Sequence, residues 1–333
     1  MPETVTPTHL HAQPDHPVKT GHKPGSEAAM IVGSMAIDSV RTPLGEVDEK
    51  VGGAAVYSSV AATFFSPVRL VGVIGDDFPP DYLQLLESRG VDLQGVQHAQ
   101  GKTFRWKGYY DYDLNQAHSL STELNVFETF SPDLPADYRN SKYVMLANID
   151  PTLQLQVLEQ ARHPRLTLCD TMNYWISSKK DELLEVFRRV KVVIINDGEA
   201  RQLCETFSLV TAADQIRALG PETVIIKKGE HGAICFHGDS VFVAPPFPLR
   251  RIVDPTGAGD TFAGGFIGYL SRSGDLSEPS IRRAVIYGSV LASFNIEDFG
   301  IDRMRNLTLP EIHARYRELR DVSFFEEMDE STF

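Results

Sequence analysis

The chain has 333 residues, of which 42% are hydrophobic and 23% are charged, so it can bury a sizeable core and is not a mostly disordered protein. Its 45 acidic residues outnumber its 32 Lys and Arg residues, giving a formal net charge of −13. An acidic surface of this kind argues against nucleic acid or an anionic membrane as a partner. The three cysteines are far apart, and no apolar run approaches the ~18 residues of a membrane span, so we expect a cytoplasmic protein without disulfides.

Both ends of the chain have a composition that is typical of tails. Residues 1–27 are rich in Pro, His, Thr and Lys and show no apolar period, which predicts a disordered leader. The leader contains four histidines, but their irregular spacing favours a solvated segment over a metal-binding tract. Residues 323–333 form an acidic C-terminal tail that we expect to fray. The folded domain should therefore span residues 28–322.

Between the tails, short apolar runs alternate with segments of helical period. The runs predict buried strands at residues 30–34, 69–74, 143–147, 166–169, 192–195 and 224–227. Helices are predicted at residues 54–65, 81–89, 153–161, 179–190, 198–207 and 212–219. This alternation indicates an α/β protein, a three-layer α/β/α sandwich with a mostly parallel central sheet. Ligands bind such sheets at the carboxyl ends of their strands.

One segment departs from this alternation. In residues 103–125, Phe104, Trp106 and Tyr110 share one parity, which predicts an amphipathic strand, and an Asp-Leu-Asn turn leads into a second strand. Residues 40–53 can supply further strands. We expect these strands to form a small β-element apart from the main sheet, here called the lid. Its aromatic stripe can pack against a helix or a second subunit, or it can cover a ligand.

The strongest local signal is a glycine-rich turn at residues 253–270 that enters an apolar helix near Asp260. Gly257 and Gly259 allow the turn to expose its N–H groups, and together with the helix dipole these form a hole suited to a phosphoryl group. Asp260 can cap the helix, or it can accept a proton from a substrate hydroxyl beside that hole.

This turn, D254-P-T-G-A-G-D260, resembles the D-T-x-G-A-G-D signature of the ribokinase-like (phosphofructokinase-B) family of carbohydrate and nucleoside kinases, with Pro255 where the family often has Thr. Further segments resemble motifs of the family and follow one another in the family's order: residues 33–38, 52–53, 73–78, 196–199 and 228–232. The resemblance therefore covers roughly residues 30–309. There is no G-x-x-x-x-G-K-[ST] motif, and Phe262 stands where a dinucleotide fold would have its third glycine.

The resemblance implies ATP and Mg²⁺ as cofactors, and it assigns roles on the phosphate side. Asp260 would be the catalytic base, and the N–H groups of Gly257, Ala258 and Gly259 would bind the transferring phosphate. Asn196 and Glu199 would lie near Mg²⁺ and contact it through water, although Asn and Glu three apart also form a capping box. Lys227 or Lys228 could pair with phosphate, or be ordinary strand-end residues. The remaining residues expected on the nucleotide side are Lys228, Gly229, Gly232, Asp254, Ser293 and Asn295.

The resemblance also assigns residues to the acceptor side. Asp38, at the carboxyl end of the first strand, would bind two hydroxyls of the acceptor at once. Gly52 and Gly53 would allow the backbone to approach the acceptor closely. Tyr57 stands where the family often has an Asn that contacts a sugar hydroxyl. The other residues expected around the acceptor are Phe104, Trp106 and Asn173.

These features together predict an ATP-dependent phosphotransferase that moves the γ-phosphoryl of Mg-ATP to a hydroxyl of a small sugar or polyol. A nucleoside kinase of the same family is an alternative, because the aromatic stripe could stack on a base. An alternative of another class is a catalytically idle regulatory module that binds a nucleotide or sugar. Lids in this family often join two subunits, so a homodimer through the lid is expected.

Overall fold

We describe the protein from a computed structural model, which covers residues 27–327. The predicted leader up to residue 26, including its histidines, and residues 328–333 of the predicted acidic tail lie outside the described residues.

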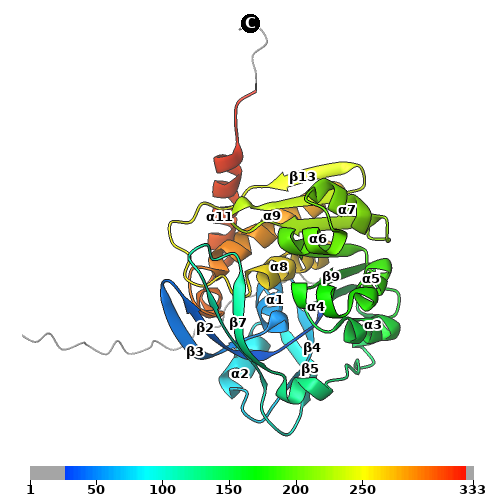
Figure 1. Ribbon diagram of the computed structural model, residues 1–333, viewed down its shortest axis with the longest axis vertical. Coiled ribbons are helices and arrows are strands. Elements are labelled where there is room, and N and C mark those ends of the chain that lie inside the picture. The colour runs from blue at the N-terminus through cyan, green and yellow to red at the C-terminus, as the bar shows by residue number, and fades with distance from the viewer. Residues whose placement is uncertain (1–26, 328–333) are drawn as a thin grey trace, which may run out of the picture.

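A nine-stranded sheet forms the middle layer of the protein (Figure 1), in the order β13-β12-β11-β10-β9-β8-β1-β4-β5. Seven neighbouring strands run parallel: β1 (Ala29–Val32), β4 (Val68–Ile74), β5 (Val91–His98), β8 (Tyr143–Leu146), β9 (Leu166–Asp170), β10 (Val192–Asn196) and β11 (Thr223–Lys227). The antiparallel hairpin β12 (Ala233–His237) and β13 (Ser240–Ala244) closes one edge. The six predicted strands are confirmed to within two residues. The hairpin and β5 were not predicted, because their exposed polar positions break the apolar runs.

Helices cover both faces of the sheet and confirm the predicted α/β/α sandwich. One face buries its apolar side chains against α1 (Ala54–Ala62), α2 (Pro80–Ser88), α8 (Ala258–Ser273), α9 (Glu278–Asn295), α10 (Asp302–Arg305) and α11 (Leu309–Ser323). The other face packs on α3 (Pro151–Gln160), α4 (Asn173–Ser178), α5 (Lys180–Arg189), α6 (Asp197–Cys204) and α7 (Leu209–Arg217). In residues 27–327 no helix combines the length and the apolar character needed to cross a membrane.

The predicted small β-element is a separate four-stranded sheet, in the order β3-β2-β6-β7. Its strands are β2 (Ala36–Thr42), β3 (Gly45–Gly52), β6 (Phe104–Tyr110) and β7 (Ala117–Glu123). The expectation that Asp38 ends the first strand of the main sheet was wrong. The chain leaves β1 at Val32, turns through Gly33, and enters the lid two residues before Asp38. Asp38 therefore reaches the site from the base of the lid.

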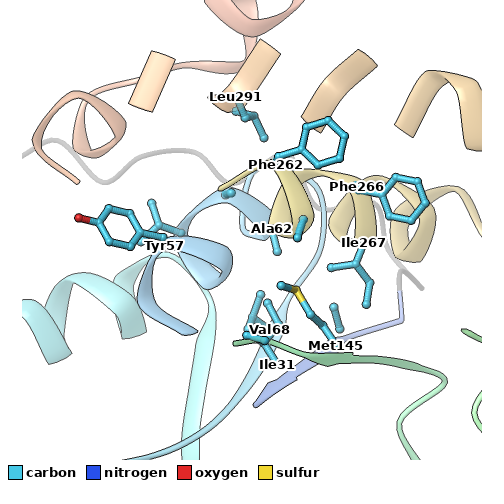
Figure 2. Close-up of a cluster of buried hydrophobic side chains, with 14 of the residues drawn as sticks. Ile31, Tyr57, Ala62, Val68, Met145, Phe262, Phe266, Ile267 and Leu291 are labelled. Atoms are coloured by element: carbon cyan, nitrogen blue, oxygen red, sulfur yellow. The ribbon is translucent and has the colours of Figure 1, made fainter. Parts of the chain in front are cut away.

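Helix α8, which begins in the glycine-rich turn, is held by close packing against α1. Figure 2 shows Phe262, Phe266 and Ile267 of α8 with Ala62 of α1 above the strand residues Ile31 and Met145. A Cβ at Gly264 would lie only 2.1 Å from the carbonyl oxygen of Ser58, so the two helix backbones are in direct contact there. The hydroxyl of Ser58 also donates a hydrogen bond to the carbonyl oxygen of Asp260 at 3.0 Å. Together these contacts fix the start of α8 relative to the sheet.

The Gly264→Ala variant tests this packing, because the account and helix propensity predict changes of opposite sign in the free energy of unfolding. Helix propensity alone would stabilise the protein by about 1 kcal/mol. A collision with the Ser58 backbone instead predicts a loss of about 1–3 kcal/mol in the free energy of unfolding, measured by urea denaturation. Gly198→Ala, on the exposed first turn of α6, is the control and should be neutral or stabilising. A stabilised Gly264→Ala protein would contradict the account.

Candidate active site

The glycine-rich turn places a helix N-terminus at the carboxyl edge of the sheet. Gly257 is the N-cap of α8 and has a φ of 73°, a left-handed conformation that favours glycine. A Cβ at Gly257 would also lie 2.4 Å from Cδ1 of Tyr57, so the ring of Tyr57 lies directly against the turn. N–H groups in the first turn of a helix lack partners within the helix and attract anions. The turn can therefore attract an anion, and Asp260 lies in the first turn of the helix.

A partly buried ammonium lies beside this turn. The Nζ atom of Lys227 is 3.2 Å from each carboxylate oxygen of Asp170, and the two side chains are 18% and 4% exposed. A Cβ at Gly259 would come within 2.8 Å of the same Nζ atom. The ammonium therefore packs against Gly259, and a larger residue there would have to push the end of the Lys227 side chain aside.

The charges in this cluster perturb one another. Burial, and then the nearby carboxylate of Asp170, raise the pKa of Asp260 to about 7, while Lys227 opposes that shift. Burial raises the pKa of Glu199 to about 7, again against the effect of Lys227. Burial alone would lower the pKa of Lys227, but the three neighbouring carboxylates raise it, so the ammonium stays charged. The cluster thus contains one fixed cation and carboxyl groups that change protonation near neutral pH.

By sequence, either Lys227 or Lys228 could pair with phosphate, and of the two only Lys228 is among the residues expected on the nucleotide side. The structure brings Lys227 to Asp260, whereas the backbone N–H of Lys228 donates to the carbonyl of Gly232 in the following loop. Lys227 on β11 pairs with Asn196 on β10, so it stands at the carboxyl ends of the two strands. This position explains why Lys227, and not Lys228, comes near Asp260. Asp170, at the end of β9, was also not among the expected site residues.

Asn196 and Glu199 form the capping box of α6. The side chain of Asn196 accepts from the N–H of Glu199 at 2.7 Å, and the carboxylate of Glu199 accepts from the N–H of Asn196 at 2.9 Å. In the described part of the chain no group of three or more His, Cys, Asp and Glu could hold a metal directly. The second carboxylate oxygen of Glu199 is not used by the box, which fits contact with a hydrated Mg²⁺ through water rather than direct ligation.

Asp38 and the glycine pair of the lid form a second buried acidic site. A Cβ at Gly52 would lie 2.0 Å from Oδ2 of Asp38, and the backbone of Gly53 hydrogen-bonds the same carboxyl group. Burial, followed by the charge of Asp254, raises the pKa of Asp38 to about 8. Burial and then Asp38 raise the pKa of Tyr57 well above its ordinary value. The structure therefore brings Asp38, Gly52, Gly53 and Tyr57 together beside the glycine-rich turn.

Asp254 and Asn295 hold the turn rather than facing away from it. Asp254 accepts from the N–H of Thr256 at 2.9 Å and from that of Gly300 at 3.3 Å. The amide of Asn295 donates to the carbonyl of Thr256 at 2.9 Å. The hydroxyl of Ser293, by contrast, donates to Val290 and accepts from Arg315 of α11, so its hydrogen bonds lie within the helical layer.

The contacts of the other expected residues lie elsewhere in the lid, in α4 and in the loop after β11. Phe104 contacts Phe127 with ring centroids 5.5 Å apart. The Trp106 indole donates to Ser119 of β7 at 2.9 Å on the open face of the lid. Asn173 is the first residue of α4. Gly229 and Gly232 flank a short turn, with φ values of 53° and 80°. Tyr110, which the sequence predicts only as part of a stripe that could stack on a base, reaches the turn: its hydroxyl accepts from Thr256 Oγ1 at 3.3 Å.

Replacement of Asp260 by Asn should stabilise the protein. The pKa of Asp260 is about 7 in the folded chain and 3.8 as its ordinary value, so its contribution to stability is lost as pH rises across that window. Above pH 7 the buried charge is a cost that the neutral amide of the variant would not have. A gain of about 1 kcal/mol would raise Tm by about 2–4 °C at pH 8, with a smaller difference at pH 5. The control is Asp239→Asn in the exposed β12–β13 turn, and a lower Tm for Asp260→Asn at pH 8 would contradict the burial argument.

Comparisons with known proteins show the family to which the chain belongs. The model of the pfkB family carbohydrate kinases matches residues 26–306. The cytidine kinase of Thermococcus kodakarensis is 33% identical over 254 residues, which are 75% of this chain and 90% of that protein. The ribokinase of Lactococcus lactis is 27% identical over 87% of this chain and 97% of its own length.

The fold also matches solved structures. The crystal structure of aminoimidazole riboside kinase from Salmonella enterica, complexed with aminoimidazole riboside and an ATP analogue, superposes with a TM-score of 0.69 at 21% identity. The match covers 87% of this chain and 99% of that one. The chain therefore belongs to the pfkB family of carbohydrate kinases and is a small-molecule phosphotransferase.

Proposed function

We propose that the protein is an ATP-dependent kinase that transfers the γ-phosphoryl group of ATP to a hydroxyl of a nucleoside. The observation that carries this proposal is the position of Asp260. Its partly buried carboxyl lies within the first turn of α8, beside the glycine turn and the ammonium of Lys227. A proton acceptor next to an anion-binding element is the arrangement that phosphoryl transfer to an alcohol requires.

Each group in the cluster has a part in the proposed reaction. Asp260 takes the proton of the acceptor hydroxyl while the oxygen of that hydroxyl attacks the γ-phosphorus. The bond between the γ-phosphorus and the β–γ bridging oxygen breaks, and ADP is released. The N–H groups of Gly257 and Gly259, with the charge of Lys227, bind the transferring group. The N–H of Ala258 donates to the carbonyl of Pro255 at 3.1 Å and would have to exchange that bond to join them. Mg²⁺, held through water by Glu199 at the capping box, would neutralise phosphate charge. Asp38 would bind acceptor hydroxyls.

A nucleoside replaces the sugar or polyol that is the first expectation from sequence. The 33% identity to a cytidine kinase over most of both chains supports this revision. Tyr57, which is buried against the turn, also takes the place of the amide that commonly contacts a sugar hydroxyl in the family. A sugar acceptor is the second candidate, because the ribokinase matches 97% of its own length. The presence of both the glycine-rich turn and Asp260 beside it argues against a catalytically idle binding module.

The predicted homodimer through the lid and the cytoplasmic location remain predictions. The lid face that carries Ile37 and Ser39 is lined mainly by polar and charged side chains, including Glu49, Arg105 and Lys107. A dimer formed there would bury these charges, so sedimentation of the purified protein at low and high salt is the direct test of that contact.

ADP release across a panel of nucleosides, sugars and polyols tests the proposed activity. We expect acceptor-dependent turnover with a nucleoside, and a fall of about 10²–10⁴-fold in kcat for Asp260→Asn, because a general base contributes about that much. ATP binding by the variant should be retained. Asp239→Asn is again the control. Turnover of a sugar but no nucleoside would favour the second candidate, and undiminished turnover by Asp260→Asn would contradict the role of Asp260.

Lys227→Met should lower kcat/KM and also change its pH dependence. Asp260 must be deprotonated to act as a base, so activity should fall as pH drops through about 7. Lys227 lowers the pKa of Asp260, so removal of its charge should move this acid limb to higher pH. Lys227→Arg should keep the limb in place, and Lys228→Met is the control for a neighbouring charge. An unmoved limb in Lys227→Met would show that the ammonium does not act on the base.

A further inference from the structure

We propose that Tyr110 of the lid is a positioning residue that holds the anion-binding turn through Thr256. This inference rests on the proposed function and adds a residue to it. Tyr110 is the last residue of β6, and the pairing of β6 with β2 places it on the same face of the lid as Asp38. Its hydroxyl accepts from Thr256 Oγ1 at 3.3 Å across 146 residues of sequence.

Thr256 is the point at which this contact acts, because it directly precedes Gly257. All three polar groups of Thr256 are hydrogen-bonded: its N–H to Asp254, its carbonyl to the amide of Asn295, and its hydroxyl to Tyr110. Asp254 and Asn295 belong to the α/β body, so only the contact with Tyr110 comes from the lid. A shift of Tyr110 therefore acts on the residue that sets the direction of the following N–H groups.

The hairpin that carries Tyr110 touches the nucleotide side at a second point. In the loop between β6 and β7, Oδ1 of Asn115 lies 2.6 Å from where a Cβ of Gly229 would be. Gly229 begins the short turn that the family resemblance places beside the nucleotide. One hairpin thus contacts both the anion-binding turn and the nucleotide-side loop, so the lid is tied to the phosphate region as well as to the acceptor.

The chemistry of the Tyr110 hydroxyl suits a neutral hydrogen-bonding role. Burial, opposed by the bond from Thr256 and assisted by Asp254, Asp38 and Asp260, raises its pKa, so the phenol keeps its proton at neutral pH. Since Thr256 donates to the phenolic oxygen, the phenolic proton is left to point elsewhere in the site. Tyr110 therefore supports the turn with its oxygen and does not compete with Asp260 as a base.

Hydrogen exchange tests the contact without any substrate. The reporters are three amides whose hydrogen bonds define the turn: Thr256 to Asp254, Ala258 to Pro255, and Thr261 to Gly257. Tyr110→Phe removes only the hydroxyl, and the loss of one hydrogen bond should speed exchange of these amides about 2- to 10-fold. Tyr109→Phe is the matched control, because Tyr109 stacks on His118, 4.8 Å away, and has Arg41 over its ring. Unchanged exchange in Tyr110→Phe would overturn the inference.

Kinetics then test the consequence for the reaction. With saturating acceptor, we expect kcat of Tyr110→Phe to fall about 10-fold while KM for ATP stays within about twofold, since the hydroxyl orients the turn rather than binding the nucleotide. Thr256→Val should give the same loss, the double variant no further loss, and Thr256→Ser should retain activity. A kcat of Tyr110→Phe equal to that of the wild-type protein would overturn the inference. If the wild-type protein itself shows no turnover, that result counts against the proposed function, and the exchange experiment alone decides on Tyr110.

Discussion

The ammonium of Lys227 is the charge on which the rest of the site depends. Asp170 and Glu199 are buried beside it and Asp260 is partly buried, so the charged form of each carboxyl group is poorly solvated there. One fixed cation among them keeps Asp260 near the point where it can exchange a proton at neutral pH. The same ammonium faces Gly259, so the group that tunes the base also adds positive charge where the helix N-terminus attracts an anion.

The position of the site relative to the sheet is determined by packing between helices rather than by charge. The backbone contact between Gly264 and Ser58 and the hydrogen bond from Ser58 to Asp260 set the start of α8 against α1. Tyr57, one residue earlier on α1, lies against Gly257. Helix α1 thus positions both the base and the anion-binding turn. Holding these carboxyl groups in the site lowers the stability of the protein. Because their pKa values are raised in the folded state, the free energy of unfolding decreases as pH rises.

Much of this could be predicted from sequence, for physical reasons that also explain the failures. Strands such as β10, buried on both faces, are continuous apolar runs, and the glycine turn with Asp260 is a local signal that needs no partner. The choice between Lys227 and Lys228 was not local, since it depends on the pairing of β11 with β10. The aromatic stripe predicted a strand but not which ring would meet Thr256, because that depends on where the lid crosses the sheet edge. Asp38 was assigned to the wrong strand for the same reason: the turn at Gly33 starts a second sheet.

The most direct test is a structure of the protein with ADP, aluminium fluoride and a nucleoside acceptor, since this complex mimics the transferring phosphoryl group. The account predicts the fluoride complex on the N–H groups of Gly257 and Gly259, within hydrogen-bonding reach of Lys227, with the acceptor hydroxyl on the carboxylate of Asp260. A fluoride complex bound away from this turn, or an acceptor hydroxyl out of reach of Asp260, would contradict it.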